Sequence, residues 1–151
     1  MKIKSARMGD VEINPASIIT FTDGIIGFPD QKRYVELDFL GDSSPLRLLQ
    51  AVDSPELGFI IIDPYIFVPG YSVNLSEYDV ASLSAAGPDE LEIKAIVTIP
   101  EDPYDMTANL QGPIIINKKS MLARQVVNNE SGYGTKHKIL TNPMSAPVAG
   151  V

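Results

Sequence analysis

Apolar side chains occur along this chain in short runs, and two of these runs show the two-residue alternation that is typical of half-buried β-strands. In Tyr34–Leu40, Tyr34 falls on the same face as Glu36 and Asp38, so we expect that face to be the polar one. Leu91–Ile99 begins with a similar alternation. Because glycine, proline and aspartate separate the runs, further strands are predicted at Ile18–Phe21, Leu46–Val52, Phe59–Ile62, Pro113–Asn117 and Leu122–Asn128.

One short helix stands out among the strands, at Glu77–Ala85. Ser76 can cap its first turn, and the acidic Asp79 three residues later is favoured by the helix dipole. Gly87 followed by Pro88 predicts that the helix ends there, with Gly87 in the left-handed conformation. Many short strands with few helical signals predict a mainly β fold, a compact antiparallel β-barrel-like single domain with one or two short helices.

The length of 151 residues fits one domain, which we place at residues 1–140. Residues 141–151 contain two prolines, small side chains and no charge, and this composition predicts a disordered C-terminal tail. Pro64 and Pro69 within Asp63–Tyr71 each remove a backbone donor, so that segment is predicted to be an edge strand or an ordered loop. The glycines of Asp23–Gly27 indicate a turn between strands.

The net charge of −7 is unevenly distributed. Residues 30–110 carry fifteen acidic and four basic side chains, whereas residues 111–151 carry one acidic and five basic side chains. Such an acidic middle repels nucleic acid phosphates and anionic lipid, and it attracts a basic partner protein. The alternative interpretation is that the acids only keep a β protein in solution.

Several features bear on cellular location. The chain has no cysteine, which fits a reducing cytoplasm and excludes thiolate chemistry. Charges interrupt the first fifteen residues every few positions, unlike a signal peptide, and the longest apolar runs are too short to span a bilayer. We expect a soluble cytoplasmic protein that does not bind membranes.

Catalytic chemistry has little support in the sequence. His137 is the only histidine, no serine lies in a nucleophile-elbow pattern, and no phosphate-binding glycine motif occurs. Glu101, Asp102 and Asp105 could hold a hard cation or serve an acid–base enzyme, but a solvated acidic loop is the favoured interpretation. No cofactor is expected.

Aromatic residues cluster in one acidic stretch of the chain. Stacking platforms of this kind can bind RNA on a small barrel, which leaves an oligonucleotide-binding module as an alternative. The nearby acids disfavour RNA and favour a protein interface, where aromatic side chains are enriched. The aromatic candidates are Tyr65, Phe67 and Tyr71, and the acidic ones are Asp63, Glu77, Asp79, Glu101, Asp102 and Asp105.

Several short motifs resemble the FliW family of flagellar assembly factors, over about Met1 to Leu140. They are Gly24-Ile-Ile-Gly-Phe-Pro29 with Arg33-Tyr34, Val97-Thr-Ile-Pro100, Met106-Thr-Ala-Asn-Leu110, Gly112-Pro-Ile-Ile-Ile-Asn117 and Arg124-Gln-Val126. Within these motifs, the residues that match family positions and that we interpret as structural are Phe28, Asn109, Pro113, Asn117 and Gln125.

The resemblance implies a β-barrel protein of the cytoplasm that is not an enzyme. It implies two protein partners, flagellin and the basic RNA-binding translational repressor CsrA, which exchange on the protein and so couple the flagellin level to flagellin translation. CsrA would be antagonised by docking beside its RNA site. We expect no direct binding of nucleic acid and a monomer when no partner is bound.

Overall fold

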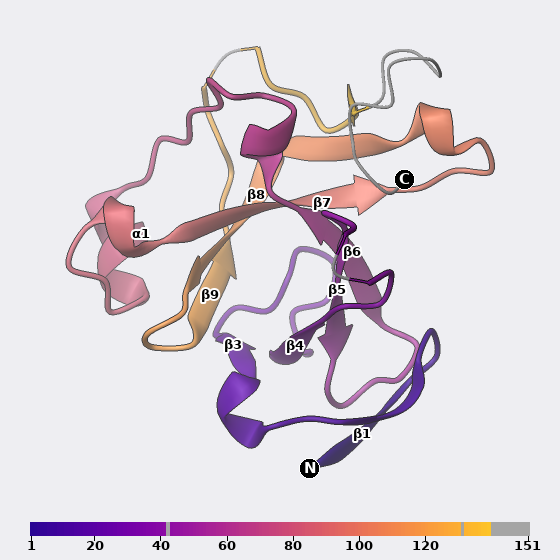
Figure 1. Cartoon of the computed structure of the whole chain (residues 1–151). Helices are drawn as coiled ribbons and strands as arrows, with labels where there is room; N and C mark the ends of the chain where they lie inside the picture. Colours follow the sequence, from indigo (N-terminus) through magenta and orange to yellow (C-terminus); the bar gives the residue numbers. More distant parts are fainter. Residues whose placement is uncertain (42, 131, 140–151) are drawn as a thin grey trace.

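The computed structural model describes residues 1–41, 43–130 and 132–139, so the tail predicted to be disordered at 141–151 lies outside the described residues. Strands make up most of the regular structure (Figure 1). Their bounds are β1 Lys2–Ser5, β2 Gly9–Glu12, β3 Ile19–Phe21, β4 Arg33–Leu37, β5 Arg47–Ala51, β6 Gly58–Ile62, β7 Glu92–Thr98, β8 Thr107–Asn117, β9 Leu122–Gln125 and β10 His137–Lys138.

Strands β3 to β9 form a closed barrel in which each strand pairs antiparallel with the next along the chain. The ring is completed by β3 and β9, which pair in parallel, with Thr20 opposite Leu122 and Phe21 opposite Ala123. The short β10 extends the sheet beside the beginning of β8. The prediction of a mainly antiparallel barrel is confirmed, and the parallel closing pair is a detail that the sequence pattern did not predict.

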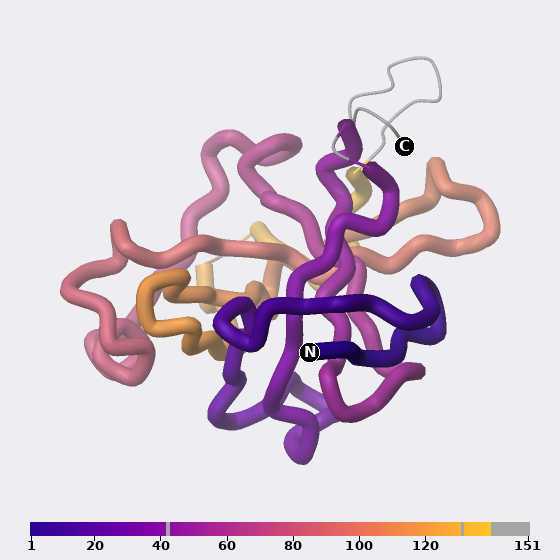
Figure 2. Tube along the Cα trace, turned by 60° about the horizontal axis from the view of Figure 1, so that its bottom comes forward, coloured from indigo at the N-terminus to yellow at the C-terminus, as the bar shows by residue number. Residues whose placement is uncertain are grey.

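The N-terminal residues form the separate β1–β2 hairpin, which crosses in front of the barrel strands in Figure 2. Ile3 and Ile13 from this segment pack against Val35 of β4. The other face of β4 points into the barrel, where Tyr34 is completely buried. The expectation that Tyr34 lies on a polar face is therefore wrong, because β4 is covered on both sides.

A bulge in β8 changes which residues of this strand face the barrel interior. Lys94 of β7 pairs with Ile114, but Ile96 pairs with Asn109, so β8 contains extra residues between these two positions. Before the bulge, Ala108 belongs to the core on the outer side of the sheet. After the bulge, Ile114 and Ile116 lie in the barrel interior. The bulge therefore moves alternate side chains of β8 from the outer side of the sheet to the interior.

The helix α1, Glu77–Ser82, begins as predicted but ends differently. Ser76 and Asp79 form a reciprocal capping box, in which each side chain accepts the backbone N–H of the other residue. The left-handed position after the helix is taken by Ser84 with φ 57°, whereas Gly87 has φ −164° and is extended, which corrects the predicted stop. Over the described ranges, no helix is long and apolar enough to cross a bilayer.

Candidate protein-interaction surfaces

The segment Asp63–Tyr71 is an ordered loop, the second of the two conformations that its prolines predict. It begins with one 3₁₀ turn, Pro64–Ile66, capped by Asp63, whose carboxylate accepts the Tyr65 N–H at 2.9 Å. The Tyr65 ring is 40% exposed and packs edge-on against Tyr71, with 5.9 Å between the ring centroids. Burial, followed by the neighbouring Asp63 charge, raises the pKa of Tyr65. The turn thus presents an aromatic ring beside a carboxylate.

Tyr71 anchors this loop to the sheet. Its side chain is 4% exposed, and its hydroxyl donates to the Leu110 carbonyl oxygen at 2.6 Å. The amide of Asn128 donates to the same hydroxyl at 3.3 Å. Burial raises the pKa of Tyr71 to about 12. Tyr71 therefore holds the loop to β8, and the aromatic surface open to a partner consists of its neighbours Tyr65 and Phe67.

Strand β10 connects the aromatic loop to the acidic β7–β8 loop. The half-buried Phe67 ring lies 5.8 Å from the His137 ring. The next residue, Lys138, places its ammonium group 3.6 Å from a carboxylate oxygen of Asp105. The only histidine therefore packs against an aromatic ring between two candidate segments.

The acidic β7–β8 loop is exposed throughout Glu101–Asp105. Asp102 caps a 3₁₀ turn, Pro103–Asp105, by accepting the Tyr104 N–H at 3.0 Å. Glu101 makes no ion pair among the described residues. In the same part of the chain, no group of three or more acidic or histidine side chains is arranged to hold a metal ion. The geometry fits the solvated acidic loop that the sequence favours.

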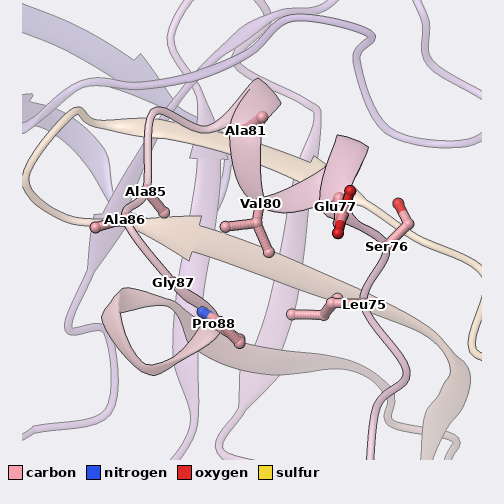
Figure 3. A pocket seen from close by; sticks show the side chains of 9 residues that line it. All are labelled: Leu75, Ser76, Glu77, Val80, Ala81, Ala85, Ala86, Gly87 and Pro88. Carbon is pink, nitrogen blue, oxygen red and sulfur yellow. The ribbon is translucent and has the colours of Figure 1, made fainter.

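Glu77 and Asp79 lie on one short helix but have different surroundings. Glu77 is exposed at the edge of a hollow of about 420 Å³ beside α1, towards which Val80 and Leu75 point (Figure 3). Asp79 is used inside the fold, because it caps α1 and lies 3.6 Å from the guanidinium of Arg124. Of these two candidate charges, Glu77 is therefore the one available to a partner. The remaining lining of the hollow is Ser76, Ala81, Ala85, Ala86, Gly87 and Pro88.

The predicted site residues do not form one patch. Helix α1 and the β7–β8 loop lie at opposite ends of the long β7–β8 ribbon (Figure 1). The aromatic loop and β10 are linked to the loop end by the Phe67–His137 contact and the Lys138–Asp105 ion pair. The structure thus separates Glu77 from Glu101 and Asp105, although all belong to the acidic middle of the sequence.

Residues of the quoted motifs meet at a polar frame elsewhere on the barrel. Gln125 of β9 accepts the Ile26 N–H at 2.9 Å through its side-chain oxygen and donates to the Gly112 carbonyl at 2.8 Å. The Asn109 side chain accepts the Gly112 N–H at 2.9 Å. This frame fixes the turn at Gly24–Phe28 against the bulge of β8. Sequence reasoning interpreted these residues as structural and did not identify the surface that they support.

These features define the class of the molecule: a small closed β-barrel protein with ordered, exposed acidic and aromatic loops. The profile of the FliW protein family matches residues 2–139. The chain belongs to the FliW family of flagellar assembly factors.

Individual relatives agree with this assignment. The flagellar assembly factor FliW of Treponema denticola is 41% identical over 140 residues, which cover 93% of this chain and 94% of that protein. The corresponding protein of Geobacter sulfurreducens is 39% identical over 137 residues, covering 91% of this chain and 85% of the relative. A crystal structure of the flagellar assembly factor FliW superposes with a TM-score of 0.87 at 34% identity, covering 95% of this chain and 99% of that one.

Proposed function

We propose that this flagellar assembly factor works by binding proteins and not by catalysis, with flagellin and the translational repressor CsrA as its two cytoplasmic partners. The observation that carries the proposal is the exposure of Glu77, Glu101 and Asp105 on ordered elements, with Asp105 alone of the three within ion-pair distance of a cation in the described residues. Carboxylates of this kind attract a basic partner such as CsrA.

The two kinds of surface residue have separate roles in the proposed complex. The carboxylates raise the rate of encounter with a basic surface, and this effect weakens as salt screens the charges. Tyr65 and Phe67 supply apolar contacts that slow dissociation. Negative charge held beside the RNA site of CsrA weakens RNA binding, which accounts for antagonism without occupation of that site.

The charge test uses exposed carboxylates that cap neither a helix nor a turn, and of these only Asp105 has an ion-pair partner in the described residues, the exposed Lys138. Glu77→Lys and the double variant Glu101→Lys/Asp105→Lys are compared with Glu56→Lys, which makes the same charge change as Glu77→Lys at an exposed turn between β5 and β6. Asp79 and Asp102 are left intact because they cap α1 and a 3₁₀ turn.

Surface plasmon resonance with CsrA at two ionic strengths measures the outcome. We expect the Glu77 and Glu101/Asp105 variants to associate several-fold more slowly at low salt, a difference that shrinks at high salt, while Glu56→Lys behaves like the wild type. Association that responds neither to salt nor to these reversals would reject the charge model. Absence of CsrA and flagellin binding by the wild-type protein would reject the proposed function itself.

The aromatic contacts are tested through the dissociation rate. Phe67→Ala and Tyr65→Ala are expected to speed release of CsrA about tenfold or more, because truncating an interface anchor costs about 2 kcal/mol or more. Ile26→Ala, which changes a 68% exposed side chain on another part of the barrel, is the matched control. Unchanged dissociation in both aromatic variants would place the anchor elsewhere.

A further inference from the structure

The beginning of strand β7 has a neighbouring strand on one side only. Its residues 92–94 pair with the end of β8, whereas β6 pairs with residues 95–97 and reaches no further. Strand β6 stops at Ile62 because the chain then turns away into the 3₁₀ turn Pro64–Ile66. In the described part of the chain, residues 92–94 therefore have no partner strand on the β6 side, and they are here called the open edge of β7.

The open edge of β7 presents backbone groups that are free to pair. Successive residues of an antiparallel strand direct their N–H and C=O groups to opposite sides, so at least one of these three residues directs both groups away from β8. Among the described residues, no loop backbone takes the place of β6 and bonds to them. An unpaired strand edge of this kind is a template for one more strand.

A hollow of about 300 Å³, here called the edge hollow, lies along the open edge. The open edge and the preceding Leu91 line one side of it, and Asp63 and Tyr65 of the aromatic loop line the other. Pro88 completes the lining. The edge hollow thus lies between β7 and the segment that follows β6, which is the place that an added strand would occupy.

The side chains of the edge hollow favour a basic group. Neither Glu92, which is exposed, nor Asp63 makes an ion pair within the described residues. Lys94 is the one cation of the lining, so the edge hollow contains two carboxylates and one ammonium group. The 40% exposed ring of Tyr65 adds an aromatic surface. An aromatic ring beside carboxylates is a suitable environment for a lysine or arginine side chain.

We propose that the open edge of β7 binds an extended segment of a partner protein as an added strand, and that a lysine or arginine of this segment enters the edge hollow between Tyr65 and Glu92. This inference rests on the proposed function, in which Tyr65 contacts a protein partner, and it names the backbone contact made there. A helix bound at the same place would cover the N–H and C=O groups of the open edge without pairing them, at a cost in free energy. An extended segment pairs them.

The test uses the full chain and short peptides of defined sequence. The isotope-labelled protein is titrated with acetyl-Thr-Val-Arg-Val-Thr-amide, whose β-branched residues favour an extended conformation, and binding is followed by nuclear magnetic resonance. One control peptide has glutamate in place of arginine. A second control peptide carries N-methyl groups on its three central residues, which removes backbone donors as proline does. Hydrogen exchange of the amides of residues 92–94 is measured with and without the arginine peptide.

The arginine peptide is expected to bind with a Kd of about 1 mM, to shift the resonances of the open edge and Tyr65, and to slow exchange of the outward-directed amide. Both control peptides should bind about tenfold more weakly, because one reverses the charge and the other cannot donate to the edge. Glu92→Lys should abolish the preference for arginine over glutamate. Glu56→Lys, the same change at an exposed turn between β5 and β6, should keep it.

Three results would overturn the inference. They are the absence of a saturable shift at the open edge with the arginine peptide, equal binding of the N-methylated peptide, and a preference for arginine that survives in Glu92→Lys. Neither CsrA nor flagellin enters this experiment. Its failure is therefore distinguishable from failure of the proposed function, which is measured with those two proteins.

Discussion

At the residue scale, two buried tyrosines offer a controlled comparison. Tyr71 donates its hydroxyl to the Leu110 carbonyl, whereas the buried hydroxyl of Tyr34 has no hydrogen-bond partner in the described residues. Tyr71→Phe is therefore expected to lower the free energy of unfolding by about 1–2 kcal/mol, and Tyr34→Phe to leave it unchanged or raise it. Urea denaturation measures both free energies of unfolding. An equal loss of stability in the two variants would contradict the conclusion that only the Tyr71 hydroxyl makes a stabilising hydrogen bond.

Two glycines of one turn separate backbone strain from steric conflict. Gly24 and Gly27 both have positive φ, but a Cβ at Gly24 would meet the Phe28 carbonyl oxygen at 2.5 Å, and one at Gly27 would meet nothing within 4 Å. Gly27→Ala should cost about 1 kcal/mol through its φ alone. Gly24→Ala should cost about 3 kcal/mol or more, because overpacking is added. Equal melting temperatures of the two variants would show that the turn relaxes freely.

At the element scale, the sequence predicted what local physical chemistry determines. Short apolar runs, two of them alternating, located the strands β3 to β7 and β9, and the Ser76–Asp79 pair located the start of α1. The β1–β2 hairpin was not predicted, although charged and apolar residues alternate in it, because each alternating run is only about four residues long, the lower limit of a strand signal. The bulge of β8 and the first half of that strand were missed as well. A register shift depends on the partner strand, so it produces no repeating pattern of apolar residues in the sequence.

The candidate site was predictable as segments and not as an arrangement. The acidic loop is exposed and the aromatic loop exposes Tyr65 but buries Tyr71, and composition cannot tell this, nor that Asp79 is used by a cap and an ion pair while Glu77 is exposed. Nor can it tell that Ile26 and Val127 share a surface, since they lie about a hundred residues apart and meet through barrel closure. The available sequence signal for this surface was the presence of apolar residues next to turn glycines.

Packing between β8 and the α1 region supplies the element-scale prediction. Ile115 is fully buried and packs with Leu83 and Val126 on the outer side of β8, while its neighbours Ile114 and Ile116 point into the barrel. Ile115→Ala should lower the free energy of unfolding by about 2–5 kcal/mol. Ile99→Ala, at a 43% exposed position, is the control and should change it by less than about 1 kcal/mol. A small effect at Ile115 in urea denaturation would mean that the layer over β8 is loosely packed.

At the scale of the whole molecule, stability should depend on alkaline pH. Burial raises the pKa of Tyr34 and of Tyr71 to about 12, above the value of about 10 in an unfolded chain. Between these values the unfolded state releases protons that the folded state keeps, so stability is fully present below pH 10 and falls towards pH 12. The expected slope is about 1.4 kcal/mol per pH unit for each tyrosine.

Urea denaturation at pH 8, 10 and 11 measures this slope for the wild type and for Tyr34→Phe. The variant keeps only the Tyr71 contribution of the two, so its stability should decline about half as steeply above pH 10. A stability that stays constant up to pH 11 in the wild type would show that these hydroxyls ionise in the folded state as they do in the unfolded chain.

The parallel closing pair of the barrel has a consequence for how the chain is made. On the side of β3 away from β4, Thr20 and Phe21 pair with Leu122 and Ala123, which the ribosome adds roughly 5–20 s later at ordinary rates of synthesis. During that interval β3 can pair with β4 on one side but has a bare edge on the other, beside an apolar sheet that is not yet enclosed. A nascent chain stalled before β9 should therefore aggregate or be held by chaperones. Chains in which residues 122–125 have been translated should no longer do so.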